Sequence, residues 1–324
     1  MMRLVFAIGL TFGCALAQVP RIGVIDYYGL RKTPASRIQQ ELRVKPGDPL
    51  PPSKADIEER LESIDGIVAA RVEAVCCEAG GVILFAGVQE RGTPRFEWRE
   101  PPASDVVLPS EIVEAYQEFL ESYRGSASAE AAITVPPASL AKFAGLARSH
   151  FKTLREVLRE SADADHRTMA AHLLLYAEDR AAAAQDLQFA LRDPEEAVRQ
   201  NALRSLGELA IFAAGHPESE IRISPTWPVE MLNSLAWRDR AGAMQLLLTL
   251  SENRAPAVLD LMRERAVPQL TEMARWNSLQ HALPAYILLG RIAAMPDEMI
   301  QQTWGAGERE RQLAIIEKTL KSAR

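Results

Sequence analysis

A short pattern recurs in the second half of this 324-residue chain and limits what that half can fold into. Ala-x-x-x-Leu-Gly stands intact at Ala202 and Ala285, and in degraded form at Ala171 and Ala243. The successive alanines are 31, 41 and 42 residues apart. Periods near forty, with small residues where helices touch, are typical of stacked helix pairs. We therefore expect residues 163–324 to form an all-α array in which each unit packs on its neighbours.

The clearest unit begins at Asp193 and Pro194, which fit a helix cap and the first helical position. Glu196 stands where a capping box needs its acidic partner. These residues predict a helix start at this point, followed by one apolar face. That face comprises Val198, Ala202, Leu206 and Leu209.

The series Asp-Pro-x-x-x-Val-Arg-x-x-Ala-x-x-x-Leu-Gly from Asp193 to Gly207 resembles HEAT repeats, over about half of the chain. In HEAT arrays this arginine pairs with an acidic residue of a neighbouring unit, so the resemblance implies a structural role for Arg199. The later units are irregular. Four prolines are expected to interrupt their helices: Pro256, Pro268, Pro284 and Pro296. Four tryptophans fit either core positions or contact anchors: Trp227, Trp237, Trp276 and Trp304.

The first seventeen residues have the pattern of a secretory signal peptide. One positive charge, Arg3, precedes an apolar run that ends in Ala15-Leu16-Ala17, which predicts cleavage after Ala17. An alternative interpretation makes Cys14 a lipid-attachment cysteine. The run is too short to span a bilayer, and no later stretch is long and apolar enough. We expect an exported protein, periplasmic or secreted, with no membrane helix in the mature chain and at most peripheral attachment to the envelope.

Residues 18–100 predict a small α+β domain with the order β-α-α-β-β. A strand at 22–29 precedes helix starts at Thr33-Pro34 and at Ser53. Two β-rich runs, Val68–Val75 and Val82–Val88, are separated by a stretch that fits a hairpin turn. The proline pair Pro101-Pro102 follows, and residues 101–162 predict a helical linker that caps the repeat array.

This order of elements, with certain turn phrases, resembles a POTRA domain over roughly a quarter of the chain. The phrases are Tyr28-Gly29-Leu30, Lys45-Pro46-Gly47-Asp48-Pro49-Leu50, Gly66-Ile67-Val68 and Val88-Gln89-Glu90-Arg91. POTRA domains hold partner chains in bacterial envelope assembly, sometimes by pairing with a sheet edge. The resemblance implies a binding module. Another small α/β sandwich could produce the same order of elements.

Cys76 and Cys77 are adjacent, which is unusual in an exported chain. Three interpretations stay open. The pair forms two unremarkable thiols at a strand end, a disulfide between neighbours, or an intermolecular or redox contact.

Composition and motifs argue against catalysis and against nucleic-acid binding. The net charge is −6, and the sequence lacks the clustered cationic side chains that phosphate binding requires. No zinc motif, phosphate loop, dinucleotide fingerprint or G-x-S-x-G is present, so no catalytic, cofactor-binding or metal residue is expected. The polar cluster Asp163–His166 predicts a helix start rather than a metal site.

These observations together predict a non-enzymatic adaptor or scaffold of the bacterial cell envelope that binds other proteins. The alternatives are a holdase-like periplasmic chaperone for unfolded clients and an enzyme whose site the sequence does not show.

Overall fold

The computed structural model describes residues 19–124 and 137–322. The expected signal peptide at 1–17, with Cys14 and the Ala17 cleavage site, lies outside these residues. The strands are β1 (Ile22–Tyr28), β2 (Ile67–Glu78) and β3 (Gly81–Glu90). The α-helices are α1 (Ala35–Leu42), α2 (Ala55–Glu62), α3 (Ser110–Arg124), α4 (Pro137–Ser149), α5 (Phe151–Glu160), α6 (Ala164–Leu173), α7 (Arg180–Ala190), α8 (Glu196–Gly215), α9 (Thr226–Met231), α10 (Trp237–Leu250), α11 (Pro256–Arg265), α12 (Val267–Ala274), α13 (Leu279–Ile292), α14 (Asp297–Gly305) and α15 (Arg309–Ser322). Short 3-10 turns lie at Leu174–Tyr176 and Pro217–Ser219.

The first part of the described chain is a small α+β unit, as the sequence predicts. Its three strands lie in the order β1-β3-β2, with β1 parallel and β2 antiparallel to β3. Helices α1 and α2 cover one face, where Ile38, Leu42, Ile57 and Leu61 pack onto the sheet. The expected hairpin turn is shorter than predicted. Both cysteines lie inside β2, and the turn itself is Ala79-Gly80.

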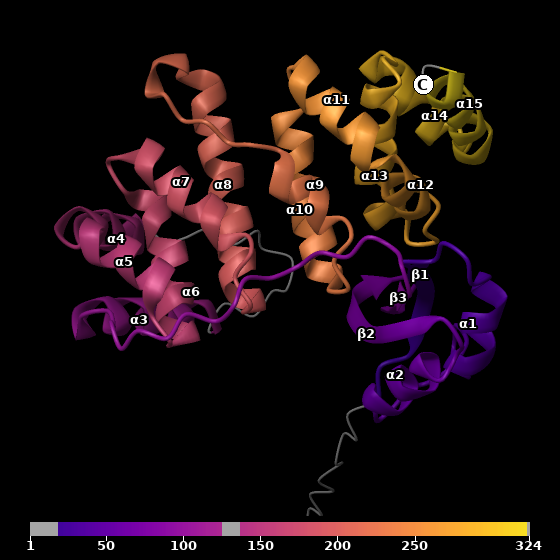
Figure 1. Ribbon diagram of the computed structural model, residues 1–324, viewed down its shortest axis with the longest axis horizontal. Coiled ribbons are helices and arrows are strands. Elements are labelled where there is room, and N and C mark those ends of the chain that lie inside the picture. The colour runs from indigo at the N-terminus through magenta and orange to yellow at the C-terminus, as the bar shows by residue number, and fades with distance from the viewer. Residues whose placement is uncertain (1–18, 125–136, 323–324) are drawn as a thin grey trace, which may run out of the picture.

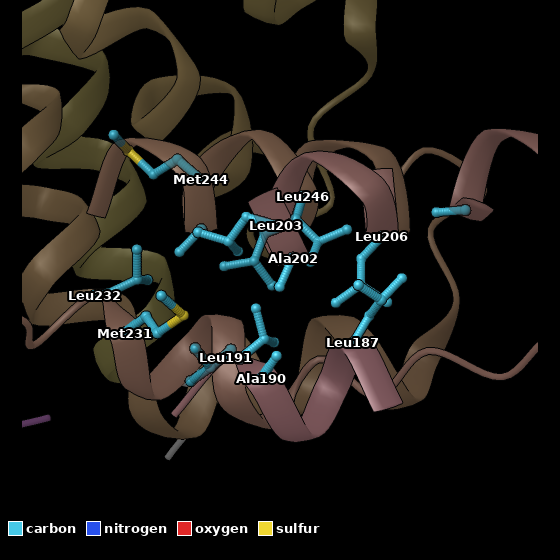
Figure 2. Packing of buried hydrophobic residues seen from close by; sticks show 14 of the residues in the cluster. Leu187, Ala190, Leu191, Ala202, Leu203, Leu206, Met231, Leu232, Met244 and Leu246 are labelled. Atoms are coloured by element: carbon cyan, nitrogen blue, oxygen red, sulfur yellow. The ribbon is translucent and has the colours of Figure 1, made fainter. Parts of the chain in front are cut away.

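The second part is a row of helices that pack in chain order (Figure 1). Helices α6, α8, α10 and α13 contact one another successively, and α7, α9 and α12 each pack against α8, α10 and α13 respectively. The motif alanines Ala171, Ala202, Ala243 and Ala285 are all fully buried, because a methyl group lets two helix backbones approach closely. Figure 2 shows the leucines and methionines that fill the space between α7, α8, α9 and α10.

Helices α3, α4 and α5 pack at the α6 end of the row, and α14 and α15 pack at the α13 end. An extended segment, residues 91–109, connects the sheet to α3. Figure 1 shows it crossing the ends of the intervening helices. The N–H of Arg99 donates to the carbonyl oxygen of Arg192, just after α7, and the N–H of Ser104 donates to that of Glu160 at the end of α5. The N–H of Leu108 donates to the side chain of His166 on α6. This long connection is therefore an ordered part of the packed structure.

The start of α8 differs from the prediction. The helix begins at Glu196, and the side chain of Glu195 accepts the N–H of Ala197, so Glu195 is the cap. Asp193 is fully buried and binds arginines instead, and Pro194 lies ahead of the first helical residue. The Asp193 carboxylate also accepts the N–H of Glu195 at 2.9 Å, so it holds the turn before α8 as well as the arginines, but it does not cap the helix itself.

The prolines expected to interrupt the later helices mostly begin them. Pro256 starts α11, Pro268 lies in the first turn of α12, and Pro296 precedes α14. In the first turn a missing N–H breaks no helical hydrogen bond, so proline is tolerated there. Pro284 lies inside α13, which continues past it.

The α+β unit is docked on the helical row. The sheet face opposite α1 and α2 carries Tyr28, Ile83 and Phe85, which belong to the same buried cluster as the helices. Phe85 stacks on Trp237 with ring centroids 4.9 Å apart and lies 5.0 Å from the ring of Trp276. The sheet is therefore enclosed between α1 and α2 on one face and the helical row on the other.

Among the described helices, none is both long enough and apolar enough to cross a membrane.

Candidate interaction surface

A continuous groove follows the exposed side of α8, α10 and α13. Two adjoining cavities of ≈ 390 Å³ and ≈ 410 Å³ form it, and they share Gln200, Gly242 and Gln245. The first extends to Gln280 and His281 at the start of α13, and the second runs along α8 to Ile211. We call these two cavities the helical groove.

The groove offers both apolar surface and free amide groups. Ile211 is 59% exposed at one end. Among the described residues, the side chains of Gln245 and Gln280 have no hydrogen-bond partner, whereas Gln200 donates to Asp239 at 3.2 Å. An amide side chain carries both donors and an acceptor, which suits it to bind the backbone of another chain.

Gly207 lies in this groove, within the twenty-residue helix α8. A Cβ at this position would meet nothing within 4 Å, so no intramolecular packing requires glycine there. Glycine in a helix interior costs about 1 kcal/mol relative to alanine. The absent side chain keeps the groove open at this point.

Buried ion pairs fix the helices that carry the groove. Arg167 on α6 binds Asp193 with two hydrogen bonds of 2.9 Å. Arg199 on α8 binds Asp239 on α10 at 2.9 Å, and it also donates to the carbonyl oxygens of Asp193 and Pro194. Each arginine thus joins its own helix start to the next helix in the row, since a guanidinium can donate in several directions at once.

The third arginine of this series connects the row to the sheet. Arg240 on α10 donates to the carbonyl oxygen of Ser234 at 2.6 Å and lies 3.8 Å from Glu272 on α12. Its guanidinium lies over the ring of Tyr28 on β1, 4.6 Å from the centroid. Burial lowers the pKa of Arg240, which the nearby carboxylate of Glu272 partly offsets.

Carboxylates of the sheet cap two helices of the row. Asp26 on β1 accepts the N–H groups of Asn277 and Ser278, immediately before α13. Glu78 accepts the N–H of Leu279, the first residue of α13, at 3.1 Å. Glu73 accepts the N–H of Trp237, the first residue of α10, at 2.9 Å. Negative charge at a helix N-terminus is stabilising, so these contacts hold the two parts together.

The side chain of Asp26 is almost completely inaccessible to solvent. Burial raises its pKa, and the N–H donors of Ser278 and Asn277 oppose that effect. The Asp26 carboxylate holds the residues before α13, and it does not line the helical groove.

Both sheet edges are engaged within the chain. On β1, Ile22 exchanges backbone hydrogen bonds with Gly47 and Asp48, and farther along Trp276 donates to the carbonyl oxygen of Tyr27. On β2, the outward N–H groups of Ala70 and Val72 donate to the carboxylates of Glu62 and Glu58 on α2. These groups are not available to pair with an added strand.

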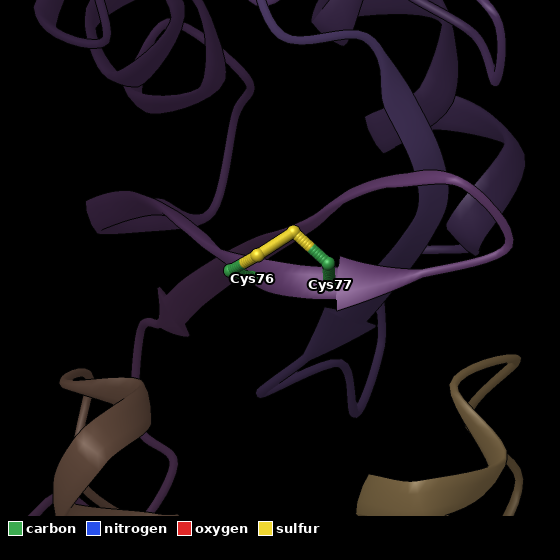
Figure 3. The surroundings of a disulfide bond; sticks show 2 residues. All are labelled: Cys76 and Cys77. Atoms are coloured by element: carbon green, nitrogen blue, oxygen red, sulfur yellow. A yellow bond between two sulfur atoms is a disulfide. The ribbon is translucent and has the colours of Figure 1, made fainter. Parts of the chain in front are cut away.

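Cys76 and Cys77 are joined by a disulfide and lie exposed on β2 (Figure 3). Of the three interpretations left open by the sequence, the structure has the disulfide between neighbours.

The other residues singled out in the sequence lie in the interior of the row. Val198, Ala202 and Leu206 are fully buried in α8, and Asp193 and Arg199 form the ion pairs described above. Asp163 caps α6 by accepting the N–H groups of Asp165 and His166, which confirms the predicted helix start. Among the described residues, no three His, Cys, Asp or Glu side chains are grouped to hold a metal ion.

The groove residues Gln200, Gln245 and Gln280 belong to no motif that predicts a binding site. The available signal was Gly207 and Gly242, two glycines within helical patterns, which mark places where something approaches a helix closely. Gly242 serves the chain itself, because a Cβ there would lie 2.7 Å from Leu203.

No family model matches this chain, and no curated protein matches it either.

Proposed function

We propose that this chain is a non-enzymatic adaptor of the bacterial cell envelope that binds a protein partner along its helical groove. In this proposal residues 163–324 form a HEAT-like solenoid, and residues 18–100 form a POTRA-like domain docked on the first residues of α10 and α13. The chain is exported after cleavage near Ala17. The pattern of the first seventeen residues supports export, and the recurring motif supports the solenoid.

The observation that carries the proposal is the open groove over Gly207 and Gln245. It runs across α8, α10 and α13, and an extended chain laid along it would meet the free amides of Gln245 and Gln280. Pairing with a sheet edge, the contact expected for the first domain, has less support, because side chains of α2 and α12–α13 loop residues occupy much of both edges. Contact through the helical groove is therefore the favoured mode.

A pair of glycine substitutions tests this function. Gly207→Trp fills the groove, whereas Gly145→Trp places the same side chain on α4, where a Cβ also meets nothing within 4 Å. We expect a partner that is crosslinked reproducibly to the wild-type chain in envelope extract to be lost with Gly207→Trp and kept with Gly145→Trp. The measurement is quantitative mass spectrometry of the crosslinked proteins.

If both variants bound the same partners equally, the helical groove would not be the binding site. A holdase would behave differently from an adaptor, since it would suppress the aggregation of several unrelated unfolded proteins. Light scattering of such clients, with and without the chain, separates the two functions.

A further inference from the structure

The disulfide lies at one of two irregularities in the pairing of β2 with β3; the other lies at the start of β2, between Ile67 and Ala69. Pairing is regular from Ala69 opposite Gln89 to Val75 opposite Ile83, and the next pair is Glu78 opposite Gly81. β2 therefore uses three residue steps where β3 uses two. One extra residue is inserted at Cys76-Cys77, which makes this point a β-bulge.

The bulge decides which face of the sheet Glu78 occupies. Successive side chains in a strand point to opposite faces. Val72 and Ala74 face α1 and α2, while Glu73 and Val75 face the helical row. By strict alternation Glu78 would lie on the α1 and α2 face with Ala74.

Glu78 instead reaches the helical row, where it accepts the N–H of Leu279 at the start of α13. A slip of one residue in a strand moves every later side chain to the other face. The inserted residue is this slip, so the contact between Glu78 and α13 depends on the bulge.

The disulfide and the bulge are linked by the geometry of a strand. A bond between the side chains of Cys76 and Cys77 requires both to lie on one side of the chain. Regular alternation would send them to opposite faces. A disulfide between neighbours is therefore compatible with the irregular stretch and opposes its conversion to a regular strand.

We propose that the Cys76–Cys77 disulfide is a redox-sensitive latch that holds Glu78 on the N-terminus of α13. A dithiol reductant opens it. One thiolate of the reductant attacks the sulfur of one cysteine and expels the other cysteine as a thiolate. The second thiolate of the reductant then resolves the mixed disulfide. Two electrons and two protons pass to the protein, which gains two thiols, and the reductant leaves as its own disulfide.

With the bond opened, Cys76 and Cys77 can alternate, and Glu78 then moves to the other face and leaves α13. Both cysteines are exposed, so a reductant has access to them. The residues that follow Leu279 are Gln280 and His281, which line the helical groove. The latch thus lies beside the groove, and its opening loosens the groove at the α13 end.

Amide hydrogen exchange of the full chain, oxidised and then reduced with dithiothreitol, tests the latch. Reduction is verified by the appearance of two further free thiols. We expect the Leu279 amide to exchange roughly tenfold faster after reduction, because it loses a hydrogen bond to a charged group. The Trp237 amide, held by Glu73 ahead of the bulge, is the internal control and should not change.

Two variants separate the latch from a general loosening. The Cys76→Ser/Cys77→Ser chain should show fast Leu279 exchange without reductant, and Glu78→Ala should show it in both redox states. Unchanged Leu279 exchange in the verified reduced protein would overturn the proposal. So would equal acceleration at Trp237, or slow Leu279 exchange in the double serine variant.

Discussion

Three buried arginines carry the contacts between successive helices. Arg167, Arg199 and Arg240 are each 3% exposed or less. Each donates to a carbonyl oxygen six residues earlier in the chain and faces a carboxylate from farther along it. Removing one partner of a buried ion pair costs about 3–5 kcal/mol, because the other charge is left without compensation. We therefore expect substitution of any one of these arginines to weaken the packing of the helix that carries it against the next helix in the row.

His172 on α6 is buried in a box of aromatic rings, and its stability effect depends on pH. Burial, with the nearby charge of Arg204, lowers the pKa of His172 to about 3. The ring stays neutral in the folded chain, and Arg204 donates to its Nδ1 at 2.8 Å. The surrounding rings belong to Tyr116, Phe119, Phe143 and Tyr176.

We expect the free energy of unfolding to fall as the pH is lowered below about 6.5, the ordinary pKa of histidine. The unfolded chain takes up a proton at His172 in this range and the folded chain does not, so acid favours unfolding. The slope contributed by this residue is up to about 1.4 kcal/mol per pH unit. Urea unfolding of the wild type and of His172→Leu between about pH 5 and pH 7, the range around the ordinary pKa of histidine, measures this slope.

The difference between the two proteins isolates His172 from the other titrating groups. Equal slopes in both proteins would show that His172 takes up its proton over the same pH range in the folded and the unfolded chain, so that burial does not lower its pKa.

At the scale of helices and strands, local sequence patterns predict where the elements lie, and tertiary contacts determine how some of them begin. The β-α-α-β-β order is as predicted, because apolar periodicity and turn residues are encoded within each segment. The cap of α6 at Asp163 was likewise predictable from neighbouring residues. The caps of α10 and α13 were not, since Glu73, Asp26 and Glu78 lie far away in the sequence.

Two glycines should respond in opposite ways to the same substitution. Gly207→Ala should stabilise the chain by about 0.5–1 kcal/mol, because alanine favours the helix and its methyl group meets open space. Gly87→Ala in β3 should destabilise it by about 1–3 kcal/mol through overpacking. Its Cβ would lie 2.2 Å from the ring of Tyr28, which is fully buried.

Urea unfolding at neutral pH measures both changes against the wild-type chain. A loss of stability in Gly207→Ala would mean that the helical groove is closed in solution, and no loss in Gly87→Ala would mean that Tyr28 can move aside.

At the scale of the whole molecule, the sheet and the helical row share one buried core. Phe85 lies at its centre, between Trp237 and Trp276 of the row and the sheet that carries it. Tyr28 adds a hydrogen bond of 2.8 Å to the carbonyl oxygen of Leu235. Docking of this kind opposes the separation of the sheet and the helical row, so we expect the two parts to unfold together.

We expect Phe85→Ala to lower the free energy of unfolding by about 3–5 kcal/mol, as for other buried aromatic truncations. Because the core is shared, tryptophan fluorescence and circular dichroism at the helical wavelength should shift together in denaturant. A fluorescence transition that precedes the loss of helix would show instead that the sheet undocks before the row unfolds.

The amino-acid sequence by itself determined the order of helices and strands and the helical character of residues 163–324, because these follow from periodicity and from residues close together in the chain. The resemblance to HEAT repeats also implied a structural role for Arg199. The tertiary structure alone decided that the second face of the sheet is buried against the helices, that carboxylates of the strands cap α10 and α13, and that the bulge at Cys76-Cys77 turns Glu78 toward α13. The physical reason is that these contacts join residues more than 150 positions apart, where no local pattern records the partner.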